Sequence, residues 1–255
     1  MSDVIYRAKG RAAEYCALAA SMYRGCGHGC VYCYGPEATK TQPLEFFTPR
    51  PRSDVMRRLQ RDASKLRRNI DKAGGEPTPV LMSFSCDPYQ PLDSELQLTR
   101  VAIKLLHHHG MPVMLLTKGG ERAIRDFDLL GPEDWFGVTL TCLDYPDGRE
   151  WEPHAAPYDE RVNSLLIAHK RGIKTWVSLE PVIYPEVSKM IVQVLHPWVD
   201  HWKVGKLNNH PRAQEIDWAA FAMDIKDLLD RHGCDYYLKE GLRELLDHEV
   251  RDDMD

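Results

Sequence analysis

Three cysteines, Cys26, Cys30 and Cys33, stand at C-x3-C-x2-C spacing, and two glycines separate the first pair. A loop this short can bring three thiolates to one compact metal centre. A closed tetrahedral zinc site and a fully ligated iron–sulfur cubane each need four ligands. Three protein ligands therefore indicate a cluster in which one iron stays open to a substrate or cofactor.

Zinc is the alternative metal, because His28 could supply a fourth ligand. His28 lies inside the loop of residues 26–33, which we call the cluster loop, and very little chain separates it from the cysteines. That position suits a fourth ligand poorly. The spacing therefore favours an iron–sulfur cluster, provided that the rest of the chain supplies a matching fold.

The composition is that of an ordinary globular protein, with 255 residues and a formal net charge of −5. No apolar run is long enough to span a membrane, and the first residues show no signal-peptide pattern. No evident linker divides the chain, so a single domain over residues 1–255 is expected. The other four cysteines are scattered, which fits free thiols in a reducing cytoplasm; they are Cys16, Cys86, Cys142 and Cys234.

Strand-like and helix-like segments alternate along the whole chain, which predicts a parallel sheet with helical crossovers. About six β/α units in this length predict an α/β fold of the partial, open TIM-barrel type. Functional groups on such a fold lie at the carboxyl ends of the strands. Strands are expected at 17–23, 80–84, 113–117, 136–142, 173–179, 201–204 and 236–238. Helices are expected at 53–72, with Ser53 as the N-cap, and at 94–109, 121–130, 158–171, 186–195 and 214–232. A short strand and helix at 235–247 and an acidic tail to residue 255 end the chain.

Three segments, in this order, resemble the radical S-adenosylmethionine (radical SAM) superfamily in its spore photoproduct lyase-like branch. They are residues 23–36 around the cysteines, 83–91 (SFSCDPYQP) and 115–118 (LLTK), and each falls at an expected strand end. The aromatic Tyr32 before the third cysteine belongs to the same pattern. The chain departs from the lyase proper in being shorter, in lacking an obvious DNA-binding extension and in its residues around Asp87.

The resemblance implies a [4Fe–4S] cluster held by the three cysteines, with SAM chelating the fourth iron. One electron would cleave SAM to methionine and a 5′-deoxyadenosyl radical, which abstracts hydrogen from a substrate. It also implies a one-electron reductant, such as flavodoxin or ferredoxin, as a partner.

Polar side chains after neighbouring strands are the candidates for contacts with SAM. Asp87 could accept from the SAM ammonium, and Lys118 could pair with its carboxylate. Thr139 and Thr141 share one face of the expected fourth strand and could offer hydroxyls. Glu180, at the end of the fifth strand, is a candidate for the ribose. The alternative for each is a solvated strand-end charge or a capping hydroxyl.

Two cysteines and two tyrosines are candidates for radical chemistry on the substrate. Cys86 and Cys142 lie at expected strand ends, where a thiol could return a hydrogen atom, although small buried cysteines also simply pack well. Tyr32 and Tyr34 flank the last cluster cysteine. They could form a tyrosine relay or pack against the cluster.

The substrate is the least determined part of the prediction. Residues 50–72 hold nine Lys or Arg against three Asp, so this segment could follow the phosphates of a nucleic acid or be a solvated outer face. With the lyase resemblance, the first interpretation gives a nucleic-acid or nucleotide substrate. The alternatives are a radical SAM enzyme acting on a peptide or small metabolite, and a non-catalytic iron–sulfur or zinc-binding module. Asp87 and Lys118 beside the motif favour an enzyme.

Overall fold

A computed structural model describes residues 3–143, 148–208 and 210–252. Its centre is an open sheet of eight strands in the order β1-β2-β5-β6-β7-β8-β9-β10. Only β1 is antiparallel to its neighbour, and all the other pairs in this sheet are parallel. The α/β prediction of a partial, open barrel is therefore confirmed. The strands are β1 Ile5–Arg7, β2 Leu18–Ala20, β5 Val80–Met82, β6 Val113–Thr117, β7 Trp135–Thr139, β8 Lys174–Val182, β9 His201–Lys206 and β10 Tyr236–Leu238.

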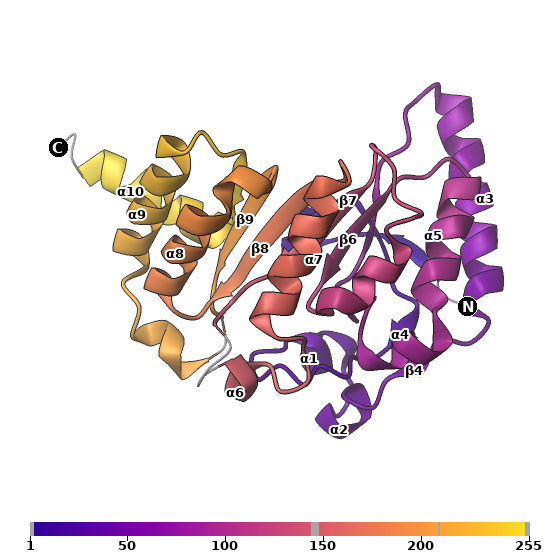
Figure 1. Cartoon of the computed structure of the whole chain (residues 1–255), viewed down its shortest axis with the longest axis horizontal. Helices are drawn as coiled ribbons and strands as arrows, with labels where there is room; N and C mark the ends of the chain where they lie inside the picture. Colours follow the sequence, from indigo (N-terminus) through magenta and orange to yellow (C-terminus); the bar gives the residue numbers. More distant parts are fainter. Residues whose placement is uncertain (1–2, 144–147, 209, 253–255) are drawn as a thin grey trace.

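The larger helices cover one face of the sheet, and Figure 1 shows α5, α7 and α8 in front of the strands. The short helices α1, α2 and α6 gather at one end of the sheet, where the cluster loop lies (Figure 1). The larger helices are α3 Val55–Ala73, α5 Leu98–His108, α7 Tyr158–Lys170, α8 Pro185–Leu195, α9 Trp218–Arg231 and α10 Glu240–Asp252. The short elements are η1 Gly10–Glu14, α1 Gly35–Thr39, α2 Pro43–Phe46, α4 Pro91–Leu96, η2 Gly120–Asp126, α6 Arg149–Trp151, η4 His196–Trp198 and η5 Pro211–Gln214, with a two-stranded ribbon of β3 Tyr23–Arg24 and β4 Arg50–Pro51.

Several expected boundaries are wrong for local reasons. The expected helix at 94–109 is two helices, because Gln97 between α4 and α5 adopts a left-handed conformation with φ of 50°. The expected helix at 121–130 is the shorter 3-10 segment η2. Asp54, not Ser53, precedes α3, and its side chain does not cap the helix. The expected strand at 17–23 is divided between β2 and β3.

The two ends of the chain also differ from expectation. β1 was not anticipated, because three residues carry little periodicity. At the other end, α10 continues to Asp252, and residues 253–255 of the acidic tail lie outside the described residues.

Alternation along the strands gives the sheet two apolar faces. In β6, Val113 and Leu115 pack in the main core beneath the helices, whereas Met114 and Leu116 belong to a smaller cluster on the concave face. Trp176 of β8 fills that concave face, where its indole lies so close to Gly137 that a side chain there would overlap it. The indole N–H donates to the Leu115 carbonyl at 3.0 Å. Trp176 of β8 therefore packs across β7 and β6 on this face of the sheet.

The segment between β1 and β2 crosses from one edge of the sheet to the other. The Glu14 carboxylate accepts from the Tyr237 hydroxyl at 3.2 Å and from the Glu240 amide at the start of α10 at 2.9 Å. Lys203 of β9 donates from Nζ to the carbonyls of Glu14 and Tyr15, both at 2.8 Å. Side chains thus join the two edges that no backbone ladder joins.

No helix in the described part of the chain is long and apolar enough to cross a membrane.

Candidate functional site

The cluster loop begins directly after β3, at the end of the sheet that carries the short helices. The Cys26 amide donates to the Phe46 carbonyl at 3.0 Å, and the Cys33 amide closes a turn onto the Cys30 carbonyl at 3.1 Å. The Gly35 amide lies 3.4 Å from the Cys33 sulfur. Backbone amides directed at sulfur are what cluster thiolates receive, so the donor set fits an iron–sulfur cluster.

Two glycines let α2 pack directly beneath this loop. A side chain on Gly25 would overlap the Phe46 carbonyl oxygen, and one on Gly35 would overlap the Phe46 ring. Gly25 also has φ of +78°, which side chains rarely adopt. Both positions therefore need glycine to hold the cysteines against Phe46.

Gly25→Ala is expected to destabilise the fold by about 1–3 kcal/mol beyond the cost of its backbone conformation, because the overlap with backbone forces the loop away from α2. The matched control is Gly74→Ala, since Gly74 has φ of +63° with nothing near an added methyl. Urea unfolding of the two variants isolates the overlap. Equal losses in both would contradict the close packing.

The three thiols are largely enclosed, and this affects their protonation. Burial raises the pKa of Cys30 to about 12 and also raises the pKa values of Cys26 and Cys33. Thiols in this environment stay protonated until metal displaces the protons. Among the described residues, no three His, Cys, Asp or Glu side chains gather as they would around a single metal ion.

His28 is engaged inside the protein and does not face the thiols as a ligand. Its Nε2 lies 3.2 Å from the Arg122 guanidinium, and its Nδ1 lies 3.5 Å from the Asp87 carboxylate. Burial lowers the His28 pKa to about 4, so the ring is neutral and accepts from Arg122. These contacts hold the middle of the cluster loop in place. They also engage both ring nitrogens of His28, which weakens the zinc alternative.

Asp87 lies at the strand ends, as predicted, and most of its acceptor capacity is used within the protein. Oδ1 accepts from the Tyr89 amide at 2.8 Å and from the Thr117 hydroxyl at 2.6 Å, and Oδ2 accepts from the Lys118 amide at 2.7 Å. A carboxylate offers about four lone-pair sites, so room remains for about one further donor. Asp87 thus joins the segment after β5 to the end of β6.

Glu152 is a buried carboxylate that the sequence did not reveal. Several of the predicted residues contact it. It accepts from the Tyr32 hydroxyl and, at 2.9 Å, from the Thr141 hydroxyl. Arg161 lies 2.6 Å from its other oxygen, and the Lys118 ammonium lies 3.9 Å away. Although burial opposes ionisation, the charges of Arg161 and Lys118 lower the Glu152 pKa to about 2. The carboxylate is therefore charged and joins the cluster loop, β6, β7 and α7.

The backbone around Glu152 is bonded to the cluster loop as well. The Val31 amide donates to the Trp151 carbonyl at 2.9 Å, and the His154 amide donates to the His28 carbonyl at 3.0 Å. Lys118 also lies over the Tyr32 ring, 5.6 Å from its centroid. Residues 151–154 therefore support one side of the cluster loop.

Cys142 and Thr139 lie beside the residues that contact Glu152, whereas Glu180 lies in a separate group with Tyr15 and Lys239. Cys142 is buried with its sulfur 3.5 Å from the Thr141 hydroxyl, and Thr139 is buried and accepts at its carbonyl from Arg161 at 3.0 Å. Glu180 instead bonds to Tyr15 and, at 3.0 Å, to Lys239. It lies over Gly205 on the β8–β10 side of the sheet.

Cys86 lies in the segment after β5, and Tyr34 directly follows the cluster loop. Cys86 is buried, and burial raises its pKa to about 11, as it does for Cys142. Both thiols are therefore protonated at neutral pH. Tyr34 is half exposed, and its hydroxyl donates to the Phe84 carbonyl at 3.3 Å. No contact among the described residues joins Tyr32 to Tyr34.

The basic segment 50–72 is largely neutralised by its own neighbours. Arg57 pairs with Asp54, Arg67 pairs with Asp71, and Arg61 pairs with Asp62 and Asp3. Arg58 is buried and donates to the Ser53 carbonyl. Much of the charge of this segment is thus engaged within the protein, and Arg50 at its start also pairs with Glu45.

Comparison with known proteins gives one family and several distant relatives. The model of the radical SAM superfamily matches residues 20–196. An uncharacterised protein of Methanocaldococcus jannaschii is 25% identical over 165 residues, which are 64% of this chain and 59% of the relative. An uncharacterised protein of Mycobacterium tuberculosis H37Rv is 31% identical over 98 residues, 38% of this chain and 28% of the relative. The chain thus spans less than two thirds of either relative.

Two kinds of solved structure share the fold. A spore photoproduct lyase mutant with bound AdoMet and dinucleoside spore photoproduct superposes with a TM-score of 0.67 at 14% identity, over 88% of this chain and 77% of the lyase. Streptococcus suis SuiB bound to S-adenosylmethionine gives a TM-score of 0.58 at 11% identity, over 86% of this chain and 45% of SuiB. Identities this low establish the architecture alone.

Proposed function

This chain belongs to the radical SAM superfamily, and we propose that Cys26, Cys30 and Cys33 hold a [4Fe–4S] cluster at which SAM is cleaved. The observation that carries the proposal is a glycine-containing loop at the carboxyl end of an open parallel barrel. The Cys30 thiol in this loop is buried, those of Cys26 and Cys33 are partly buried, and an amide is directed at the Cys33 sulfur. The family match includes the whole loop.

A cluster held by Cys26, Cys30 and Cys33 would supply the electron for the cleavage of SAM, and the resulting 5′-deoxyadenosyl radical would abstract hydrogen from the substrate. The residues of this chain position the reactants and exclude water. Glu152 and His28 hold the cluster loop from two sides, and Trp176 closes the concave face below it. A reductant of the flavodoxin or ferredoxin class would deliver the electron.

Lys118 and Asp87 are the proposed contacts for the amino-acid end of SAM. The Lys118 ammonium lies 3.9 Å from Glu152 and over the Tyr32 ring, and a ligand carboxylate would be a closer partner than either. Asp87 has capacity for about one more donor, which the SAM ammonium would provide. Thr139, Thr141 and Glu180 are weaker candidates for contacts with SAM. Thr139 and Thr141 already bond to Arg161 and Glu152, and Glu180 bonds to Lys239 on the β8–β10 side of the sheet.

Lys118→Ala is expected to weaken SAM binding by about tenfold to a hundredfold, because one charge-assisted contact is worth roughly 1.5–3 kcal/mol. Asp87→Asn, which keeps the shape of the side chain, is expected to weaken it by a similar factor. Equilibrium binding of SAM to anaerobically reconstituted protein measures both. The control is Lys189→Ala, which removes a lysine that pairs with Glu186 and Asp224 on α8 and α9. SAM affinity that is unchanged in both variants would show that the two contacts are misplaced.

We propose a nucleotide or nucleic-acid substrate for the hydrogen abstraction. The support is the shared architecture with a lyase that binds a dinucleoside, together with a group of arginines beside the cluster loop. The shared architecture with SuiB, solved also with its precursor peptide, favours a peptide as the second candidate.

One experiment tests the chemistry and begins to separate the substrates. Anaerobically reconstituted protein is incubated with SAM, a reductant and either oligonucleotides or peptides, and 5′-deoxyadenosine is measured. SAM cleavage is expected without substrate and is expected to rise with the correct class. A reconstituted protein that forms no 5′-deoxyadenosine would refute the proposed function.

A further inference from the structure

The two-stranded ribbon of β3 and β4 places three arginines on one face. Its antiparallel register sets Arg24 directly opposite Arg50, so their side chains point to the same side. The Arg52 amide donates to the Met22 carbonyl at 3.0 Å, which extends the pairing by one residue. Arg52 lies two residues beyond Arg50 and therefore shares its face.

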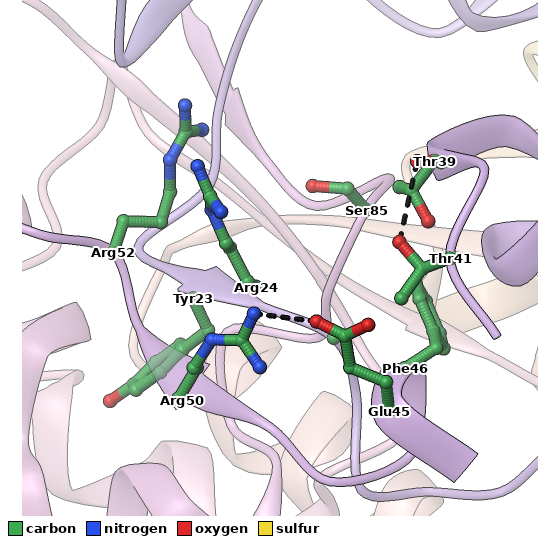
Figure 2. Close-up of a pocket in the computed structure, with 10 residues that line it drawn as sticks. Tyr23, Arg24, Thr39, Thr41, Glu45, Phe46, Arg50, Arg52 and Ser85 are labelled. Carbon is green, nitrogen blue, oxygen red and sulfur yellow. Dashed lines mark hydrogen bonds and ion pairs between the residues drawn. The ribbon is translucent and has the colours of Figure 1, made fainter. Parts of the chain in front are cut away.

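This face forms one wall of a cavity of about 370 Å³ beside the cluster loop. Figure 2 shows the side chains of Arg24 and Arg52 pointing in the same direction, with Arg50 turned toward Glu45. Glu45 is the one carboxylate among the described residues that line the cavity, and it lies 2.7 Å from Arg50. The remaining lining residues are Tyr23, Gly25, Thr39, Thr41, Phe46 and Ser85.

Three guanidinium groups and one carboxylate line this cavity. Arg50 pairs with the carboxylate of Glu45, and Arg52 donates to the carbonyls of Ser21 and Asp3, both at 3.4 Å. Like charges directly opposite each other in a ribbon repel. Arg24 makes no ion pair or hydrogen bond with any residue that the structure describes. Burial lowers the pKa of Arg52, and the charges of Arg58 and Arg24 lower it further. An anion bound between the arginines would relieve this repulsion.

We propose that this cavity binds a phosphate group of the substrate, an inference that rests on the proposed function. The planar guanidinium fork matches the oxygens of phosphate, and Arg24 offers such a fork beside the positive charge of Arg52. The one carboxylate in the lining, Glu45, already accepts from Arg50.

The position of the cavity connects this phosphate to the radical chemistry. Gly25 in its wall directly precedes Cys26, and Ser85 directly precedes Cys86 and Asp87. A substrate anchored here would lie beside the cluster loop. The volume is at the lower end of the range for small-molecule sites, so the cavity holds a phosphorylated group and not a bare ion alone.

Binding measurements on reconstituted protein with three probes test the proposal: inorganic phosphate, thymidine 5′-monophosphate and a short single-stranded DNA. Arg24→Gln is expected to lower affinity for the tightest of the three by about tenfold or more, because one charge-assisted contact is lost. The matched control is Arg68→Gln, which removes an exposed arginine from α3 and is expected to change affinity by less than about twofold. Inorganic phosphate is expected to compete with the other probes.

The probes also separate the two sources of phosphate. Tighter binding of DNA than of the mononucleotide would assign the cavity to a phosphodiester of a nucleic acid, and the reverse would assign it to a phosphorylated small molecule. Equal losses for Arg24→Gln and Arg68→Gln, or no binding of any probe, would overturn the proposal. If the same wild-type preparation still cleaves SAM, that failure concerns the cavity alone. A preparation that does not cleave SAM overturns the proposed function and this inference together.

Discussion

Replacing Cys26, Cys30 and Cys33 together by Ala is expected to leave reconstituted protein without bound iron and without SAM cleavage. The wild-type protein is expected to be brown and to carry about four irons per chain. The loss should be complete, because the triple variant keeps none of the three thiolates that the cluster needs. Iron content, visible absorption and 5′-deoxyadenosine formation measure the effect.

The matched control removes thiols that lie away from the loop. Cys16 donates to the Pro79 carbonyl at 3.0 Å, and Cys234 is half buried near the other end of the chain. Cys16→Ala with Cys234→Ala is expected to keep its iron. Stoichiometric zinc in place of iron after anaerobic reconstitution, or iron retained by the triple variant, would refute the assignment of the cluster.

Glu152→Ala is expected to destabilise the protein by about 3–5 kcal/mol, because it leaves the buried charge of Arg161 without its partner. The same change releases the Tyr32 and Thr141 hydroxyls, so the cluster loop is expected to lose iron faster than in the wild type. The midpoint of urea unfolding and the rate of iron loss to a chelator measure the two effects.

A surface carboxylate gives the comparison. Glu186 pairs with Lys189 while its side chain is 83% exposed, and Glu186→Ala is expected to cost no more than about 1 kcal/mol. Glu152→Gln keeps the hydrogen bonds from the two hydroxyls but loses the charge, so its cost should lie between those of the other two variants. A Glu152→Ala variant as stable as Glu186→Ala would contradict the buried network.

Segments whose signals are local were predicted well from the sequence. β6 was predicted with both boundaries correct, because its five residues are all buried and a proline and a lysine stand on either side. α8 was predicted to within one residue, since Pro185 occupies its first turn and its apolar residues follow helical spacing. The cysteine spacing likewise needs only eight neighbouring residues to be recognised.

Features that depend on distant partners could not be predicted in this way. Glu152 receives its contacts from four other segments, and nothing in its own neighbourhood marks it as a buried charge. Counting charges in residues 50–72 also missed that Asp3, which lies outside the segment, pairs with Arg61. The position of Asp87 was predicted correctly, but the donors that already occupy its oxygens became visible only in the folded chain.

The crossing segment between β1 and β2 has a consequence for how the molecule unfolds. Glu14 and Lys203 connect the first strands of the sheet to β9, β10 and the start of α10. Edge strands of an open sheet commonly fray independently, because each is held on one side only. Here the same few bonds hold both edges, so we expect the two edges of the open barrel to detach together when the molecule unfolds.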